Sequence, residues 1–130
     1  MPGFWNRILF IDLTRGDAWT DGIPEDVWEK YIGGVGVGSY LFTRYGGIFD
    51  PFSEKNPLII MTGPLVGTAF PNSGRHEVVS RSPLTTFLGE SNSGGRFGFE
   101  LKRSGFDGMV ITGKSDVPVS IFIDDGDFRI

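Results

Sequence analysis

The sequence predicts an α+β domain that is rich in β-structure, with mostly antiparallel sheets and a few short helices. Several short apolar runs of strand length are separated by turns that carry glycine or proline, and only three segments show apolar residues at helical spacing. Hydrophobic residues make up 39% and aromatic residues 14% of the 130 residues. This composition supplies enough apolar volume for a folded core and argues against intrinsic disorder.

The first expected element is a β-hairpin. Residues 7–13 are mostly β-branched or aromatic, which favours a strand. A turn follows in which Gly16 occupies a position that requires positive φ. Residues 18–21 are therefore expected to return as the second strand.

The next segment has the features of a short helix. Pro24 suits a first helical turn, and the two acidic residues after it favour the positive end of a helix. Apolar residues then recur at helical spacing, so a helix is expected over residues 24–32. The glycine-rich residues 33–38 are expected to interrupt it, and a second helix is expected over residues 39–45.

The second half of the chain is expected to be mostly sheet. Continuous or alternating apolar runs predict four strands, at residues 58–61, 77–80, 109–112 and 117–124. A short helix is expected over residues 96–103, since its apolar residues share one face and a glycine follows.

The C-terminal residues are typical of a second hairpin. Residues 124–127 predict a turn, and residues 128–130 begin a return strand. Because this return strand is short, we expect the domain to be truncated at its C-terminal end. No internal repeat or linker-like segment divides the chain, so residues 1–130 are expected to form one domain.

Composition excludes several functional classes. The absence of cysteine excludes disulfides, a thiol nucleophile and any iron–sulfur cluster ligated by this chain. With 12 basic and 16 acidic residues the net charge is −4, which argues against a nucleic-acid partner. No apolar run approaches the roughly 20 residues that span a bilayer. The N-terminus also lacks the features of a signal peptide, so we expect no membrane partner and a cytoplasmic location.

Three features have a simple structural interpretation. His76 is the only histidine, so a metal site or a nucleophile–base couple would need unusual partners, and a structural or surface role is favoured. The glycine run at residues 34–38 follows a helix, whereas a dinucleotide-binding loop follows a strand. The acidic residues at 124–127 lack the closing glutamate of a calcium loop and indicate a polar turn.

The strongest candidate site lies in the stretch from residue 63 to 105, where polar turns bracketed by glycine alternate with strands. Residues 92–95 are expected to form a turn whose backbone N–H groups converge, with the start of a helix beside it. Arg75, just after a Ser-Gly pair, adds a planar guanidinium with five donors. This corner suits a phosphate or a phosphorylated cofactor, and plain turn chemistry in a glycine-rich β protein is the alternative.

A set of short motifs recurs in a characteristic order along the chain. These motifs are Tyr31-Ile32-Gly33-Gly34, Gly63-Pro64-Leu65, Ser73-Gly74-Arg75, Ser82-Pro83-Leu84-Thr85, Ser91-Asn92-Ser93-Gly94-Gly95 and Gly105-Phe106-Asp107-Gly108. Each motif is weak alone. Together with the opening strand, their order and spacing resemble the N-terminal domain of tungsten-dependent aldehyde ferredoxin oxidoreductases over nearly the whole chain.

The resemblance implies a role in cofactor binding for residues 1–130. In this family the domain is a base of β-sheets on which a bis-pterin tungsten or molybdenum cofactor rests. The arginine that matches Arg75 lies between the pterin and a 4Fe-4S cluster. The turn that matches Asn92, Ser93, Gly94 and Gly95 lies at the pterin phosphates, where Mg²⁺ is held partly by backbone carbonyl oxygen. Asn92 is therefore the candidate metal ligand by resemblance.

The resemblance also implies a reaction, in which an aldehyde is oxidised to a carboxylate at the metal and ferredoxin accepts the electrons. The cluster cysteines of the family lie in later, mostly helical domains that these 130 residues do not contain. We therefore expect the isolated chain to be inactive toward aldehydes, and no residue is a candidate for catalysis. The alternative is a free-standing binding or assembly module that keeps the same β base. In either case an exposed base is expected to favour homo-oligomers.

Overall fold

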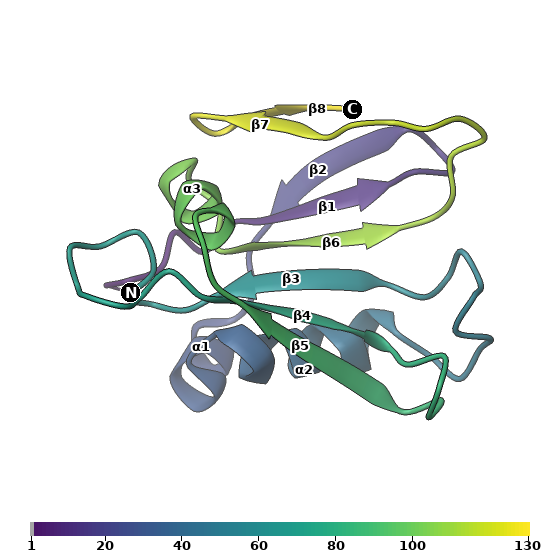
Figure 1. The fold of residues 1–130 in the computed structure, drawn as a ribbon, viewed down its shortest axis with the longest axis horizontal. Coiled ribbons are helices and arrows are strands. Elements are labelled where there is room, and N and C mark those ends of the chain that lie inside the picture. The colour runs from purple at the N-terminus through teal and green to yellow at the C-terminus, as the bar shows by residue number, and fades with distance from the viewer. Residues whose placement is uncertain (1) are drawn as a thin grey trace.

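A six-stranded mixed sheet runs through the molecule, with helices on both of its faces (Figure 1). The computed structural model describes residues 2–130. The elements in chain order are β1 (Ile8–Asp12), β2 (Asp17–Asp21), α1 (Glu25–Tyr31), α2 (Gly34–Tyr45), β3 (Leu58–Thr62), β4 (His76–Arg81), β5 (Leu88–Ser93), α3 (Phe97–Arg103), β6 (Gly108–Thr112), β7 (Phe122–Asp124) and β8 (Asp127–Arg129). This arrangement confirms the predicted α+β class.

The strand order in the sheet is β2-β1-β6-β3-β4-β5. All neighbours are antiparallel except β1 and β6, which run parallel and pair Leu9 with Met109. These two central strands are largely buried, which is why their sequences are continuous apolar runs rather than alternating ones. β4 and β5 lie at the opposite side of the sheet from the β1–β2 hairpin, and β5 is an edge strand.

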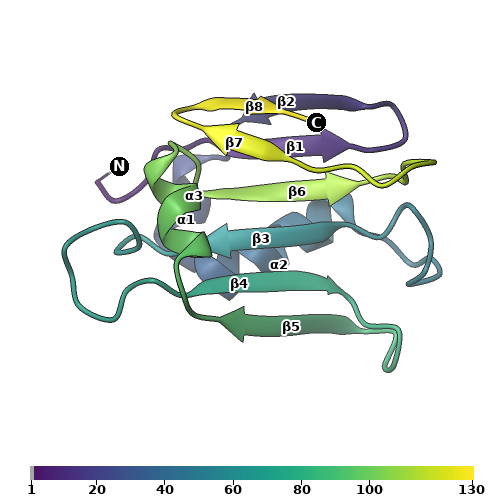
Figure 2. The same ribbon diagram turned by 45° about the horizontal axis from the view of Figure 1, so that its top comes forward.

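Two apolar cores lie on the two faces of the sheet. On one face α1 and α2 cover the sheet, and Trp28, Val37 and Leu41 pack against strand residues such as Ile59 and Val79. On the other face α3 and the β7–β8 hairpin enclose a second core around Phe106 (Figure 2). Within residues 2–130, no helix is long and apolar enough to cross a membrane.

The glycine-rich segment interrupts helical structure only at its start, where Gly33 lies between the end of α1 and the start of α2. α2 begins at Gly34, so most of the run lies inside this helix. The reason is packing: a Cβ added to Gly38 would lie only 2.9 Å from Val79 Cγ2, so glycine lets α2 approach β4 closely. Tertiary contact here overrides the low helix propensity of glycine.

Two further expectations about the second half are wrong. Residues 117–121 are not part of a strand, and only Phe122–Asp124 of that segment pairs, in the β7–β8 hairpin. Conversely, β5 was not expected, and it includes Asn92 and Ser93, which the sequence had indicated as part of a turn. β5 is polar and lies at the edge of the sheet, so its pairing with β4 leaves no apolar pattern in the sequence.

Candidate functional site

Three side chains form a hydrogen-bonded chain at the point where β4 begins and β5 ends. Arg75 immediately precedes β4, and Glu77 in β4 pairs across the sheet with Asn92 in β5. The Nε of Arg75 donates to Oδ1 of Asn92, and Nδ2 of Asn92 donates to Oε1 of Glu77. The pairing of β4 with β5 thus brings together two predicted site residues that are 17 positions apart in the sequence.

The glycines of the predicted site lie close to the three hydrogen-bonded side chains. A Cβ added to Gly74 would lie 3.1 Å from the carbonyl oxygen of Gly95, so the two bends touch. A Cβ added to Gly94 would lie 3.8 Å from Nη1 of Arg75, which places the guanidinium beside the bend after β5. Gly95 has a φ of +90° and open space around it, so its backbone is accessible to a ligand.

Ser93 contributes less to this corner than expected. It pairs with His76 across the sheet, and in the described part of the chain its Oγ makes one local hydrogen bond, to the carbonyl oxygen of Gly94 at 3.4 Å. The helix beside the bend is also short, since α3 has seven residues and carries Glu100 in its first turn. That carboxylate offsets the positive end of the helix and pairs with Arg96 at 2.8 Å, so Arg75 is the cation of the predicted site that has no carboxylate partner within residues 2–130.

The charge of Arg75 is not neutralised by a direct ion pair. The side chain is exposed, and among residues 2–130 no carboxylate lies within ion-pair distance of its guanidinium. An exposed guanidinium with unengaged terminal N–H groups is well suited to bind phosphate in a bidentate manner. The positive charge and free donors of Arg75 are the chemistry that an anion site requires.

His76 is the first residue of β4, and its side chain is buried. Its ring packs against Phe97 of α3 with centroids 5.1 Å apart, and its Nδ1 has no hydrogen-bond partner within residues 2–130. Burial lowers the pKa of the imidazole below its ordinary value. These contacts agree with the structural role that the sequence favoured.

The structure offers a metal ion few side-chain ligands. No cluster of three or more His, Cys, Asp or Glu side chains that could hold a metal occurs in the described part of the chain. The side-chain amide of Asn92 is already engaged by Arg75 and Glu77. If Asn92 binds a metal, its backbone carbonyl is the group left to do so.

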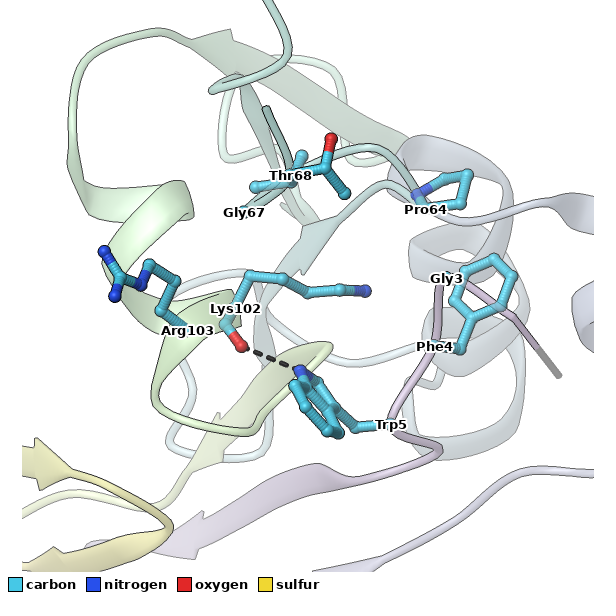
Figure 3. A pocket seen from close by; sticks show the side chains of 9 residues that line it. Gly3, Phe4, Trp5, Pro64, Gly67, Thr68, Lys102 and Arg103 are labelled. Carbon is cyan, nitrogen blue, oxygen red and sulfur yellow. Dashed lines mark hydrogen bonds between the residues drawn. The ribbon is translucent and has the colours of Figure 1, made fainter. Parts of the chain in front are cut away.

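A pocket of about 230 Å³ lies on another part of the surface, between the N-terminal segment and α3 (Figure 3). Phe4, Trp5 and Pro64 give it an apolar wall, and Trp5 Nε1 donates to the carbonyl oxygen of Lys102 at 2.8 Å. The Nζ of Lys102 is not available to a ligand, because it is paired with the buried Asp107. We therefore interpret the pocket as a gap left where the N-terminal segment packs against α3, and not as a ligand site.

Glu77 is not among the site residues that the sequence predicts, yet it is hydrogen-bonded to Asn92. Its position in a predicted strand gave no sign of function, and only the register of β4 against β5 places it opposite Asn92. The pairing of the polar residues 88–93 with β4 is the feature that identifies Glu77 as a neighbour of Asn92.

The molecule is thus an α+β domain built on a mixed sheet. At one end of this sheet it exposes the guanidinium of Arg75 beside the glycine bend at residues 94 and 95. Residues 8–130 match the family model of the aldehyde ferredoxin oxidoreductase N-terminal domain. The chain belongs to this family.

Its relatives include several oxidoreductases from Pyrococcus and Thermococcus species. A tungsten-containing aldehyde ferredoxin oxidoreductase of Pyrococcus abyssi is 43% identical over 131 residues, which cover 100% of this chain and 22% of the relative. An aliphatic sulfonate oxidoreductase, WOR-like subunit, of Pyrococcus furiosus is 37% identical over 127 residues, covering 95% of this chain and 20% of the relative. The chain thus spans about a fifth of the length of the curated relatives that it matches.

A solved structure has nearly the same fold. It is the active-site complex BamBC of benzoyl coenzyme A reductase with 1,5-dienoyl-CoA, and it matches with a TM-score of 0.94 and 30% sequence identity. The match covers 98% of this chain and 20% of that chain. The β base of this family therefore occurs in proteins whose names indicate different substrates.

Proposed function

We propose that residues 1–130 are the cofactor-binding N-terminal domain of a tungsten or molybdenum bis-pterin oxidoreductase that oxidises aldehydes to carboxylic acids, with ferredoxin as electron acceptor. The names of the curated relatives support the tungsten-containing class and the reaction. The observation that carries the proposal is the exposed Arg75 guanidinium held beside the glycine bend at Gly94. It supplies a cation beside accessible backbone, and both features support the binding of a phosphate group.

The residues present fit such a cofactor. Gly95 leaves open space beside its backbone, and the terminal nitrogens of Arg75 lie next to the same bend. Arg75 would bind phosphate oxygens or the edge of the heterocycle, and Asn92 would hold Arg75 in place and offer its backbone carbonyl to Mg²⁺. When bound, the metal and its pterins supply the two-electron redox chemistry, and the protein supplies binding and orientation.

Electron transfer would require parts of a longer protein. This chain has no cysteine and therefore cannot ligate a 4Fe-4S cluster by thiolates. Contact with ferredoxin is likewise proposed for the full-length protein. For the isolated chain we expect cofactor or phosphate binding without turnover of aldehyde.

A second candidate function is a free-standing binding or assembly module that retains the β base. The unpaired edge of β5 and the exposed apolar side chains near it favour this candidate, since both features promote association. Metal analysis of the protein purified from its native host separates the two, because tungsten or molybdenum with pterin supports only the first.

Inorganic pyrophosphate is a suitable probe of the proposed site. Isothermal titration of the 130-residue chain should show weak binding, and Arg75→Ala should weaken it about tenfold or more, since a hydrogen bond to a charged group contributes about 1.5–3 kcal/mol. Arg15→Ala is the matched control, because Arg15 lies in the β1–β2 turn at the other end of the sheet (Figure 1). Equal affinities of wild type and Arg75→Ala would contradict the assignment of Arg75.

A further inference from the structure

The side-chain amide of Asn92 orients the guanidinium of Arg75, and the carboxylate of Glu77 orients that amide. Asn92 accepts from Arg75 Nε through Oδ1 and donates to Glu77 Oε1 through Nδ2. Glu77 is anchored in β4 on the face that α2 covers, where its Cγ lies 3.4 Å from the position of a Cβ added to Gly34. The chain of hydrogen bonds therefore runs from the interior of the sheet to the exposed guanidinium.

An asparagine amide can make these two contacts in only one orientation. If the amide were turned over, Nδ2 would face the Nε–H of Arg75 and Oδ1 would face the carboxylate of Glu77. Two donors would then oppose each other at one end and two acceptors at the other. Glu77 thus selects the orientation in which Asn92 accepts from Arg75.

This arrangement orients the guanidinium without neutralising it. Of the five N–H donors of an arginine, only the one on Nε has a partner within residues 2–130, so the donors on Nη1 and Nη2 remain for a ligand. A direct ion pair with Glu77 would use those donors and cancel the charge, and the amide between the two groups prevents this. Holding a long side chain in place before binding also reduces the entropy that the ligand must offset.

We propose that Glu77 is a positioning residue, which acts through Asn92 to direct Arg75 at a phosphorylated ligand. This inference rests on the proposed function of Arg75 as the anion-binding group. The proposal adds Glu77 to the site, although its carboxylate is negatively charged like the phosphorylated ligand.

The charge of Glu77 makes the proposal distinguishable from simple electrostatics. A carboxylate near an anion repels it, so if Glu77 had no positioning role, its removal would strengthen anion binding. Glu77→Gln removes the charge but keeps an amide oxygen that can accept from Asn92. Glu77→Met removes both the charge and the acceptor at similar volume. The two variants therefore separate repulsion from positioning.

The test measures pyrophosphate affinity of the 130-residue chain by isothermal titration. Glu77→Met should weaken binding roughly three- to tenfold, the range expected for one lost hydrogen bond. Glu77→Gln should bind as well as wild type or better. Glu90→Gln is the control for charge removal, because Glu90 is exposed on β5 and takes no part in the chain of hydrogen bonds. In an Arg75→Ala background, Glu77→Met should have no further effect, which loss of folding alone would not produce.

Nuclear magnetic resonance gives a second readout that does not depend on the ligand. The Nε–H proton of Arg75 should exchange slowly with water in wild type and Glu77→Gln, and rapidly in Glu77→Met. Binding that is lost in Arg75→Ala but unchanged or tighter in Glu77→Met overturns the role of Glu77 alone. A wild-type chain that binds no pyrophosphate overturns the anion site itself, and the positioning role with it.

Discussion

The side chains of Lys102 and Asp107 form a buried ion pair that joins the end of α3 to the start of β6. Nζ of Lys102 lies 2.5 Å from Oδ1 of Asp107, and the two side chains are 6% and 0% exposed. The same carboxylate accepts from the backbone N–H groups of Trp5 and Arg7, each at 3.2 Å. Asp107 therefore attaches the N-terminal segment to the sheet.

Replacement of one member of the Lys102–Asp107 pair should lower the free energy of unfolding far more than replacement of an exposed lysine. Lys102→Met would leave the Asp107 carboxylate buried without a counter-ion, and we expect the free energy of unfolding to fall by about 3–5 kcal/mol. Urea denaturation followed by circular dichroism measures this change. Lys55→Met is the control, since Lys55 is exposed and should change stability by less than about 0.5 kcal/mol. Similar effects of the two substitutions would show that the buried pair is not important for stability.

The close approach of α2 to β4 predicts a second stability effect. Gly38→Ala would place a Cβ 2.9 Å from Val79 Cγ2, and the overpacking should reduce the free energy of unfolding by about 1–3 kcal/mol. Val79→Ala removes the methyl groups that clash, so the double variant Gly38→Ala/Val79→Ala should be more stable than the sum of the single effects indicates. Additive effects in this double-mutant cycle would mean that Gly38 is required for a reason other than contact with Val79.

These two contacts illustrate what the sequence can and cannot predict. Apolar periodicity predicted the central strands and α1, because burial dictates which residues they contain. The start of α2 and the existence of β5 depend on contacts between distant segments, at Gly38 and along the sheet edge, which leave no local pattern.

The candidate site shows the same division. Arg75 and the glycines at residues 94 and 95 are proposed from the sequence because turn chemistry and donor type are local properties, and the structure adds that Gly94 lies beside the guanidinium of Arg75. Glu77 could not be proposed from the sequence, because its contact with Asn92 depends on the register of β4 against β5. The side chain that orients the site is therefore visible only in the folded chain.

His76 predicts a specific dependence of stability on pH. Burial lowers its pKa in the folded state, so the unfolded chain, with a pKa near 6.5, binds the proton more readily. The stability contribution is present above about pH 6.5 and is lost as the pH falls below that value. Thermal unfolding between pH 7.5 and 5 should show this loss in wild type, and His76→Phe should reduce it. His76 is the only histidine, so no second imidazole complicates the measurement.

The surface of the chain predicts self-association. Leu84 and Phe87, in the connection between β4 and β5, are 92% and 76% exposed, and Ile48 and Phe52 on the neighbouring loop are 96% and 83% exposed. Arg81 connects the two loops, since its Nη1 donates to the carbonyl oxygen of Gly47 at 2.9 Å. Apolar side chains exposed to this degree beside an open sheet edge favour contact with another surface.

Light scattering over a range of concentrations tests this expectation. The wild-type chain should form dimers or larger species as concentration rises, and Leu84→Glu/Phe87→Glu should shift the equilibrium toward monomer, because a buried contact would then contain two unpaired charges. Val117→Glu/Val119→Glu is a matched control on exposed residues that precede β7. A wild-type chain that stays monomeric at high concentration would contradict the prediction. Equal effects of the two double variants would mean that the connection between β4 and β5 is not the surface involved.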